Sequence, residues 1–300
     1  MEKEIIKKIK ELKEKGEIIP ATYDSVFKCI IQDEDLKDYV AYIISNIDGR
    51  IIDIDDMIFV NTESTKNTIF DKVNVSDIII EIDSNKINLE MNKKNSKKLR
   101  SRNKAHFYDE ALKTINVSYR IGEEKYFEQI NFDNVFIKDE LISIYKRVNI
   151  KSLEEDEDEK NLIKYRVNMA NVYKKYYTDG KELTRFEKAI GILSFKKIKD
   201  LRKLAKGDNM LMKVVKKLEY LCENPDMIKL IDDEKAMEFG HKQDIKEAEK
   251  KAHDSGYSEG EALGSQKEKI EIAKRMLKMK IDIEDISQAT NLSIDEIEKL

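Results

Sequence analysis

The chain has 300 residues, and its 56 basic and 60 acidic side chains leave a formal net charge of −4. This balance excludes a uniformly basic nucleic-acid coat protein, although it permits a local basic patch. Hydrophobic residues make up 40% of the chain, which is enough to build a core and excludes wholesale disorder. At ~100–200 residues per domain, the length predicts two domains or one domain with appendages.

Cysteine content and hydropathy indicate the compartment. The two cysteines, Cys29 and Cys222, cannot form a disulfide framework, so we expect ordinary reduced thiols. No apolar run approaches the ~18–20 residues of a membrane span. The N-terminal 19 residues carry mixed charge without an apolar stretch, which argues against a signal peptide. We therefore expect a cytoplasmic protein that does not contact a membrane.

The first half of the chain alternates helical and strand-like segments. Helices are predicted over residues 5–15 and 24–46, with Asp24 as the N-cap of the second helix. Segments rich in β-branched residues predict strands further along the chain. These strands cover residues 51–60, 77–82, 87–91, 129–134 and 141–148, and a helix over 97–116 separates the third strand from the fourth.

After residue 150 the sequence predicts helices alone. An acidic run over 151–160 marks the boundary, and apolar residues then recur at helical spacing. A long helix and two short helices end the chain. The fold class that follows is α/β (α+β), and three regions are expected: a core over residues 1–150, a helical extension over 151–235, and a long glycine-punctuated helix with a helical-hairpin tail over 236–300.

Residues 76–94 carry the most informative pattern, two strand-like segments separated by the turn-forming tetrapeptide DSNK. A hairpin centred between Ser84 and Asn85 sets Ile79 opposite Glu90 and Glu81 opposite Asn88. Because side chains alternate along a strand, one face of this hairpin is wholly apolar and suits a core. The other face brings together Asp77, Ile79, Glu81, Asn88, Glu90 and Asn92.

Asp77 and Glu90 are diagonal neighbours in this hairpin, with backbone positions about 7–8 Å apart. Two carboxylates at that separation can converge on one divalent metal, because hard cations such as Mg²⁺ take oxygen ligands. A bound Mg²⁺ polarises phosphate and activates water for phosphodiester hydrolysis. The alternative is a half-exposed hairpin whose polar side chains face solvent, and the pattern alone leaves both interpretations open.

Basic residues gather around and after the second strand of this hairpin. Eight of them lie between Lys86 and Lys104, and Glu90 is the only acid in the interval. Such a stretch can neutralise DNA phosphates and fix the position of the protein on the duplex without recognising the base sequence. The alternative is the solvated start of a surface helix. The predicted DNA-binding residues are Lys93, Lys94, Lys97, Lys98, Arg100 and Arg102.

Several segments, taken in order, resemble the PD-(D/E)XK nuclease family transposases, also called recombination-promoting nucleases. The matching text is DSVFK (24–28), VNTE (60–63), SDIIIEIDSNKINLEMN (76–92), RNKAH (102–106) and YFEQINFDN (126–134). The tail from Met276 onward also resembles the tails of such proteins. The resemblance implies a restriction-endonuclease-like mixed sheet flanked by helices, and a DNA endonuclease that uses Mg²⁺ (or Mn²⁺).

The resemblance also implies roles for single residues. It assigns catalysis to Asp77, Glu90 and Asn92, with Asp77 and Glu90 as metal ligands. Glu63 and Asp24 are further candidates for an additional ligand or an orienting acid. Asn92 departs from the pattern because it occupies the place of the fold's lysine, and its amide brings no charge to the transition state. The alternative is therefore a catalytically weak or inactive nuclease-fold protein that binds DNA or a partner.

The remaining patterns have structural explanations beside the functional ones. The basic segment 196–217 fits either a clamp on the DNA backbone or a helix pair with a solvated basic face. Gly256, Gly260 and Gly264 share one helix face, which permits close approach in a homo-oligomer or marks a flexible helix. The last helix is acidic and would repel phosphate, so we expect the tail to pack or to bind a partner rather than to read DNA.

Overall fold

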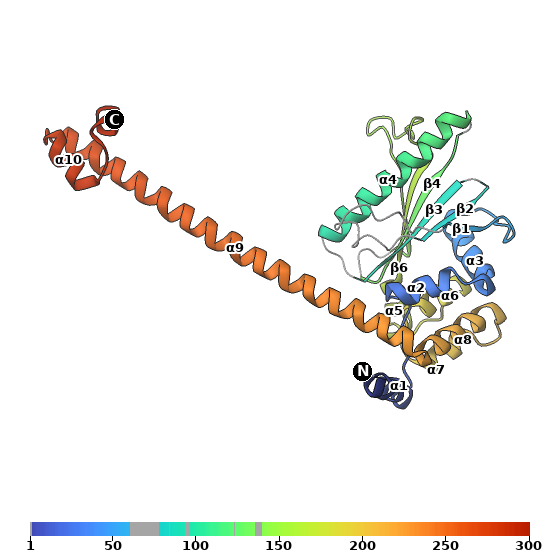
Figure 1. Cartoon of the computed structure of the whole chain (residues 1–300). Helices are drawn as coiled ribbons and strands as arrows, with labels where there is room; N and C mark the ends of the chain where they lie inside the picture. Colours follow the sequence, from blue (N-terminus) through green and yellow to red (C-terminus); the bar gives the residue numbers. More distant parts are fainter. Residues whose placement is uncertain (1, 61–77, 84, 94–96, 123, 136–139) are drawn as a thin grey trace. The chain divides into compact units, whose positions relative to one another are not determined.

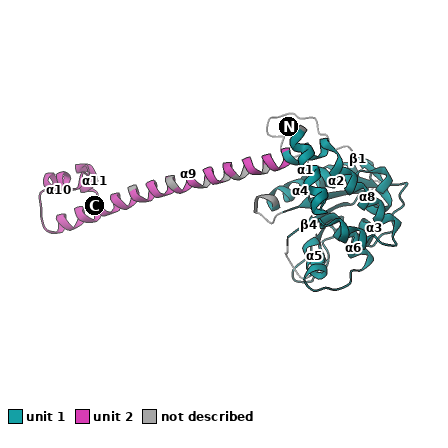
Figure 2. Cartoon of the chain, turned by 90° about the horizontal axis from the view of Figure 1, so that it is seen from below, with its two compact units in different colours: residues 1–232 teal, residues 233–300 magenta. Residues whose placement is uncertain are grey.

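A computed structural model of the chain describes residues 2–60, 78–83, 85–93, 97–122, 124–135 and 140–300. The chain divides into two compact units, Met1–Asp232 and Asp233–Leu300, which Figure 2 colours separately. The first unit contains a sheet between helices, and the second contains helices alone. Within the described residues, no helix is long and apolar enough to cross a membrane.

A mixed sheet of six strands forms the centre of the first unit, as far as the described ranges show (Figure 1). Its strands lie in the order β1-β2-β3-β4-β6-β5. β1, β2 and β3 form an antiparallel meander, β4 runs parallel to β3 and β6, and β5 is antiparallel to β6. The bounds are β1 Ile58–Val60, β2 Ile78–Ile82, β3 Asn85–Asn92, β4 Phe127–Asp133, β5 Ile142–Tyr145 and β6 Leu162–Asn168. β1 is thus much shorter than the strand predicted over 51–60.

The helices of the first unit lie on both sides of the sheet. α4 connects β3 to the parallel β4 and runs along one side of these strands (Figure 1). All the other helices except the first, α1, contribute to the core on the opposite side. Their bounds are α1 Glu2–Lys15, α2 Asp24–Ile31, the 3-10 helix η1 Glu34–Leu36, α3 Lys37–Asp48, α4 Lys97–Ile121, α5 Met169–Tyr177, α6 Arg185–Ser194, α7 Ile198–Leu204 and α8 Asn209–Glu223.

The sheet face opposite α4 carries the main hydrophobic core. Ile78, Ile80 and Ile87 are fully buried on this face, which confirms the apolar face predicted for the hairpin. Burying each such side chain contributes ~1.5–3 kcal/mol to stability. The same cluster of buried residues extends from Ile18 to Ile231, so helices α5 to α8 pack with the sheet in one unit.

A strand in the second half of the chain contradicts the prediction of helices alone after residue 150. β6 lies between β4 and β5, so the sheet is completed by residues far from the hairpin. Ile163, Tyr165 and Val167 face the core, and the residues between them face the other side. Ile163 and Val167 are also four residues apart. Ile163 and Val167 therefore also fit one face of a helix, which is why the sequence predicts a helix here.

The helix predicted over residues 24–46 is interrupted. α2 ends at Ile31, and Asp33 then caps the short helix η1 with its carboxylate before α3 begins. The predicted cap at Asp24 is wrong. Tyr23 holds the N-cap position without a side-chain hydrogen bond, and Asp24 is the first residue of α2.

The predicted hairpin forms, but its register differs by two residues from the prediction. Glu81 pairs with Lys86 rather than with Asn88, and Ile79 pairs with Asn88 rather than with Glu90. The turn is therefore tighter than a turn centred between residues 84 and 85. A shift of two residues leaves the alternation unchanged, so each described side chain keeps its predicted face.

The second unit is built on one long helix. α9 covers Pro225–Lys278, and α10 (Ile283–Thr290) and α11 (Ile294–Glu298) follow it, as predicted for this part of the chain. Ser293 and Glu296 form a capping box at the start of α11. A small core holds this end together, made of Ala273, Ile286, Leu292 and Ile297.

Candidate active site

Three neighbouring strands present polar side chains to α4. Their parallel registers align these residues in rows across the sheet. Because the aligned positions alternate with the core-facing residues, they share the face that α4 covers. The rows are Asn88–Gln129–Lys164, Glu90–Asn131–Arg166 and Asn92–Asp133–Asn168. We call this surface the polar face.

The polar face is buried, not solvated. Asn88 is 0% exposed, Glu90 1% and Asn92 3%. On the α4 side, Asn103 and Phe107 are also buried. The alternative of a half-exposed hairpin with solvated polar side chains is therefore wrong for β3. Buried polar groups need hydrogen-bond partners, so the partners of these residues decide what the face can do.

Asn92 is fully engaged in hydrogen bonds. Its Nδ2 donates to Asp133 Oδ1 at 3.0 Å, and its Oδ1 accepts from Asn103 Nδ2 at 2.9 Å. Asn103 Nδ2 also donates to Asn131 Oδ1 at 3.3 Å. The residue at the place of the expected lysine therefore joins β3 to β4 and to α4.

Glu90 lies beside a guanidinium from α4. Its Oε2 is 3.8 Å from Arg102 Nη2, which links a predicted metal ligand to a predicted DNA-binding residue. The Arg102 side chain is 32% exposed, so the pair connects the buried face to the surface. A cation at this distance compensates part of the cost of burying a carboxylate.

A second acid on the polar face is also paired. Arg166 Nε donates to Asp133 Oδ2 at 2.8 Å, from β6 to β4. The Asp133 side chain is 3% exposed and that of Arg166 is 25% exposed. Asp133 also accepts from Asn92, so both of its oxygens take part in contacts within the sheet.

Asp24 and Lys93 lie near one end of the hairpin. Lys93 follows β3, and its Nζ is 3.8 Å from the ring centroid of Tyr23, so the start of α2 lies close to the end of β3. Asp24 is in the first turn of α2, with Oδ2 3.4 Å from Lys28 Nζ. The role of Asp24 as an additional ligand or an orienting acid stays a prediction.

The remaining predicted residues lie outside the described ranges or on α4. Asp77, Glu63 and Lys94 lie outside the described residues. The backbone at Lys97 and Lys98 is helical, but their side chains are outside the description. Arg100 is exposed on α4. The structure therefore brings Glu90, Asn92 and Arg102 together and leaves the second predicted metal ligand, Asp77, as a prediction.

The oxygen atoms on the polar face are of the type that a hard cation binds, but the described carboxylates are too few to hold one. Among the described side chains, no group of three His, Cys, Asp or Glu residues could hold a metal. Asn88 Oδ1 and Asn103 Oδ1 accept no hydrogen bond within the described ranges. Carboxylate and amide oxygens are the ligands that Mg²⁺ takes. A metal site at Glu90 therefore needs a further carboxylate, which is the predicted role of Asp77.

Comparisons with models of protein families, with curated proteins and with solved structures found no match. The candidate function therefore rests on the residues and their geometry. Sequence reasoning assigned no role to Asn131, Asp133, Lys164 or Arg166. The alternation of polar and apolar residues along β4 was a usable signal for the first two. The other two lie on β6, where the spacing of the apolar residues also fits a helix.

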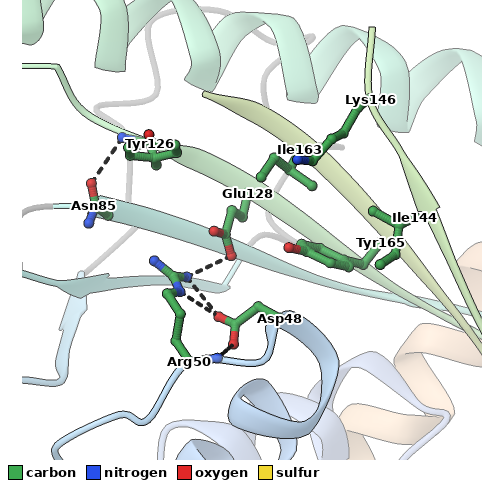
Figure 3. A pocket seen from close by; sticks show the side chains of 9 residues that line it. All are labelled: Asp48, Arg50, Asn85, Tyr126, Glu128, Ile144, Lys146, Ile163 and Tyr165. Carbon is green, nitrogen blue, oxygen red and sulfur yellow. Dashed lines mark hydrogen bonds and ion pairs between the residues drawn. The ribbon is translucent and has the colours of Figure 1, made fainter. Parts of the chain in front are cut away.

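A separate pocket of about 510 Å³ opens on the other sheet face, beside the end of α3 (Figure 3). Arg50 joins two carboxylates in it, with Nη2 2.7 Å from Asp48 Oδ2 and 2.8 Å from Glu128 Oε2. Burial raises the pKa of Glu128 to about 7, and Arg50 opposes this shift. Desolvation thus outweighs the ion pair, although the 2.8 Å contact favours the charged carboxylate. Sequence reasoning missed this cluster, because its members come from α3, the following loop and β4.

Proposed function

We propose that this chain is a metal-dependent DNA endonuclease of the transposase or recombination-promoting type, which hydrolyses phosphodiester bonds with Mg²⁺ (or Mn²⁺). The observation that carries the proposal is Glu90, a carboxylate only 1% exposed on a polar sheet face, next to a helix that begins with basic residues. Ionisable groups held in such surroundings are enriched at functional sites. The mixed sheet between helices is compatible with the restriction-endonuclease-like core that the resemblance implies.

In this proposal Glu90 and Asp77 hold the metal. Bound Mg²⁺ polarises the scissile phosphate and lowers the pKa of water. Arg102 compensates the charge of Glu90 in the metal-free protein. Arg100 and Lys104, both exposed on α4, neutralise DNA phosphates and fix the backbone near the carboxylates.

Asn92 acts as a positioning residue in this scheme. Both ends of its amide are used, one by Asp133 and the other by Asn103. It therefore fixes β3 against β4 and α4, which holds the neighbouring Glu90 in place. The positive charge that a lysine would bring has to come from another residue.

Plasmid nicking in Mg²⁺ tests the proposal. We expect the wild-type protein to nick DNA, and Glu90→Gln and Asp77→Asn to reduce the rate by about 10²–10³-fold, as losing a key electrostatic group does. Both substitutions keep the size of the side chain. Glu81→Gln is the matched control, because Glu81 lies on the same hairpin and pairs with Lys86. Equal rates for all four proteins would overturn the assignment.

A second candidate is a nuclease-fold protein that binds DNA or a partner without cutting it. The hydrogen bonds of Asn92 and the ion pair of Glu90 with Arg102 favour it, because both side chains have partners within the protein. Salt-dependent DNA binding together with no nicking in either Mg²⁺ or Mn²⁺ would support this candidate over the first.

A further inference from the structure

The first row of the polar face has no role in the proposed cleavage chemistry. It consists of Asn88, Gln129 and Lys164, which lie side by side on β3, β4 and β6. Asn88 and Gln129 are 0% exposed, and Lys164 is half-buried. Lys164 Nζ is 4.3 Å from the ring centroid of Phe107, so α4 covers this row.

Two amides in this row are buried with unused hydrogen-bonding capacity. Neither Nδ2 nor Oδ1 of Asn88 has a partner among the described residues, and Gln129 Oε1 has none there either. Burying such groups is costly, and native proteins keep few of them. The core-facing neighbours of Asn88 on the same strand, Ile87 and Leu89, are apolar and buried.

Lys164 adds a positive charge that no acid among the described residues pairs with. Both acids of the polar face are paired with other cations, Asp133 with Arg166 and Glu90 with Arg102. Burial, together with Arg166 and Lys104, lowers the pKa of Lys164 to about 8. A bound anion would relieve this repulsion and would stabilise the protonated amine.

We propose that Asn88 and Lys164 bind an anionic phosphate group of a nucleic-acid backbone, an inference that rests on the nuclease function proposed above. Gln129 lies between them, and its Nε2 donates to the Asn103 carbonyl. The phosphate oxygens pair with the Lys164 ammonium and accept a hydrogen bond from Asn88 Nδ2. Lys104, exposed on the adjacent part of α4, adds to the attraction. The row thus supplies positive charge on the polar face, where Asn92 brings none.

Access to the row depends on the first half of α4. The contacts of Asn103 with the sheet in this half are amide hydrogen bonds. Further along the helix, Phe107 and Ala111 pack against Phe127 in a small apolar cluster. Displacing the segment before Phe107 therefore breaks polar contacts, and uncovering Lys164 also requires the Phe107 ring above it to move. A phosphate can replace polar contacts of this kind.

The first test measures affinity for a fluorescein-labelled DNA duplex by anisotropy, in EDTA and over a series of KCl concentrations. Lys164→Met is expected to weaken binding about tenfold and to lower the slope of log Kd against log [KCl] by about 0.9. Lys146→Met is the matched control, because Lys146 follows β5, lines the pocket of Figure 3 and lies on the opposite sheet face. Equal effects of the two substitutions would overturn the proposal.

Asn88→Leu separates binding from stability. Removing an unused amide should raise the melting temperature by ~2–4 °C, since replacing unpaired polar atoms by apolar ones of similar shape is neutral or stabilising. The same variant should bind the duplex more weakly. A lower melting temperature with unchanged affinity would mean that Asn88 is structural. If Asn88→Leu does not fold, the Lys164→Met comparison still decides.

A third measurement distinguishes failure of this site from failure of the proposed function. The pKa of Lys164, followed by NMR of its Cε group, should rise from about 8 as inorganic phosphate is added. A rise without any DNA binding or nicking would support the phosphate site and reject the nuclease. DNA nicking, an unchanged pKa of Lys164 and an unchanged DNA affinity of the Lys164→Met protein would instead reject the phosphate site and support the nuclease.

Discussion

At the end of α3, Arg50 holds two carboxylates that are almost fully buried, Asp48 and Glu128. The pKa of Glu128 is raised from 4.5 to about 7, first because of burial and in spite of Arg50. In the unfolded chain this carboxyl releases its proton near its ordinary pKa. Between pH 4.5 and 7 the folded state therefore binds more protons, and the free energy of unfolding falls as pH rises.

Replacing Glu128 by Gln removes this dependence, because an amide does not titrate and its oxygen still accepts from Arg50. We expect the difference in unfolding free energy between pH 5 and pH 8 to shrink by about 2–3 kcal/mol relative to wild type. Urea denaturation at the two pH values measures it. Glu182→Gln, at an exposed carboxylate, should leave the difference unchanged. An equally steep pH dependence in Glu128→Gln would show that the carboxyl titrates normally.

Among the strands, β4 and β6 share one buried ion pair, between Asp133 and Arg166. Arg166→Met leaves a buried carboxylate without its cation, so we expect unfolding free energy to fall by about 3 kcal/mol. Asp133→Asn should cost less, because the amide still accepts from Asn92. The double variant should lose less unfolding free energy than the sum of the two single losses, by about 1–3 kcal/mol. Additive effects in urea denaturation would mean that the pair contributes nothing specific.

The two single variants and the double variant form a double-mutant cycle, and an exposed ion pair provides its control. Lys13 Nζ and Glu223 Oε1 are 3.0 Å apart, and both side chains are more than half exposed. Lys13→Met and Glu223→Gln should show a coupling energy below about 1 kcal/mol, because water screens the charges. Comparing the two cycles separates the effect of burial from that of distance.

Strand alternation predicted the faces of the hairpin but not its partners. Period-two alternation alone separates Ile80 and Ile87 from Asn88 and Glu90, and this survives a register shift of two residues. Turn length decides the register, and it depends on backbone angles that the tetrapeptide DSNK does not specify. The position of β6 between β4 and β5 depends on packing over the whole sheet, which local periodicity does not contain.

Single residues of the polar face were predictable to different degrees. Glu90 and Asn92 were found because they lie on the hairpin, where alternation and the family resemblance agree. Arg102 was predicted to touch DNA, and its contact with Glu90 became visible only when α4 was placed over the sheet. Asp133 and Arg166 are 33 residues apart in sequence, and their pairing is a consequence of strand order.

Across the whole molecule, the net charge of −4 averages over unlike parts. On the polar face, Lys164 has no acid partner within the described part of the chain, and the two acids beside it are paired with arginines. The tail unit carries Asp295, Glu296 and Glu298 in its last helix region. A nearly neutral chain can therefore attract phosphate at one site. The electric field within a few ångströms of a site depends on the charges nearby and not on the net charge of the chain.

α9 raises a question of stability for the second unit. It contains four glycines, Gly240, Gly256, Gly260 and Gly264, and each costs up to ~1 kcal/mol relative to alanine. A Cβ at any of them would meet no other atom within 4 Å, so nothing described in this chain requires glycine there. Phe239 (64% exposed) and Tyr257 (70% exposed) also lie uncovered on the helix. Because isolated helices gain little stability in water, we predict that α9 packs against a second copy of this chain.

Light scattering on the full chain and on residues 1–235 tests this prediction. The full chain should form a homo-oligomer and the truncated chain a monomer, since the core of the first unit ends at Ile231 and loses nothing. Gly256→Leu and Gly260→Leu should dissociate the oligomer without unfolding the protein, because a larger side chain blocks close approach only between copies. A monomeric full chain at about 100 µM, where a dimer with a Kd of roughly 1 µM would be mostly assembled, would contradict the prediction. In that case Gly256→Ala should simply stabilise α9, which circular dichroism would detect as a higher melting temperature of the helix.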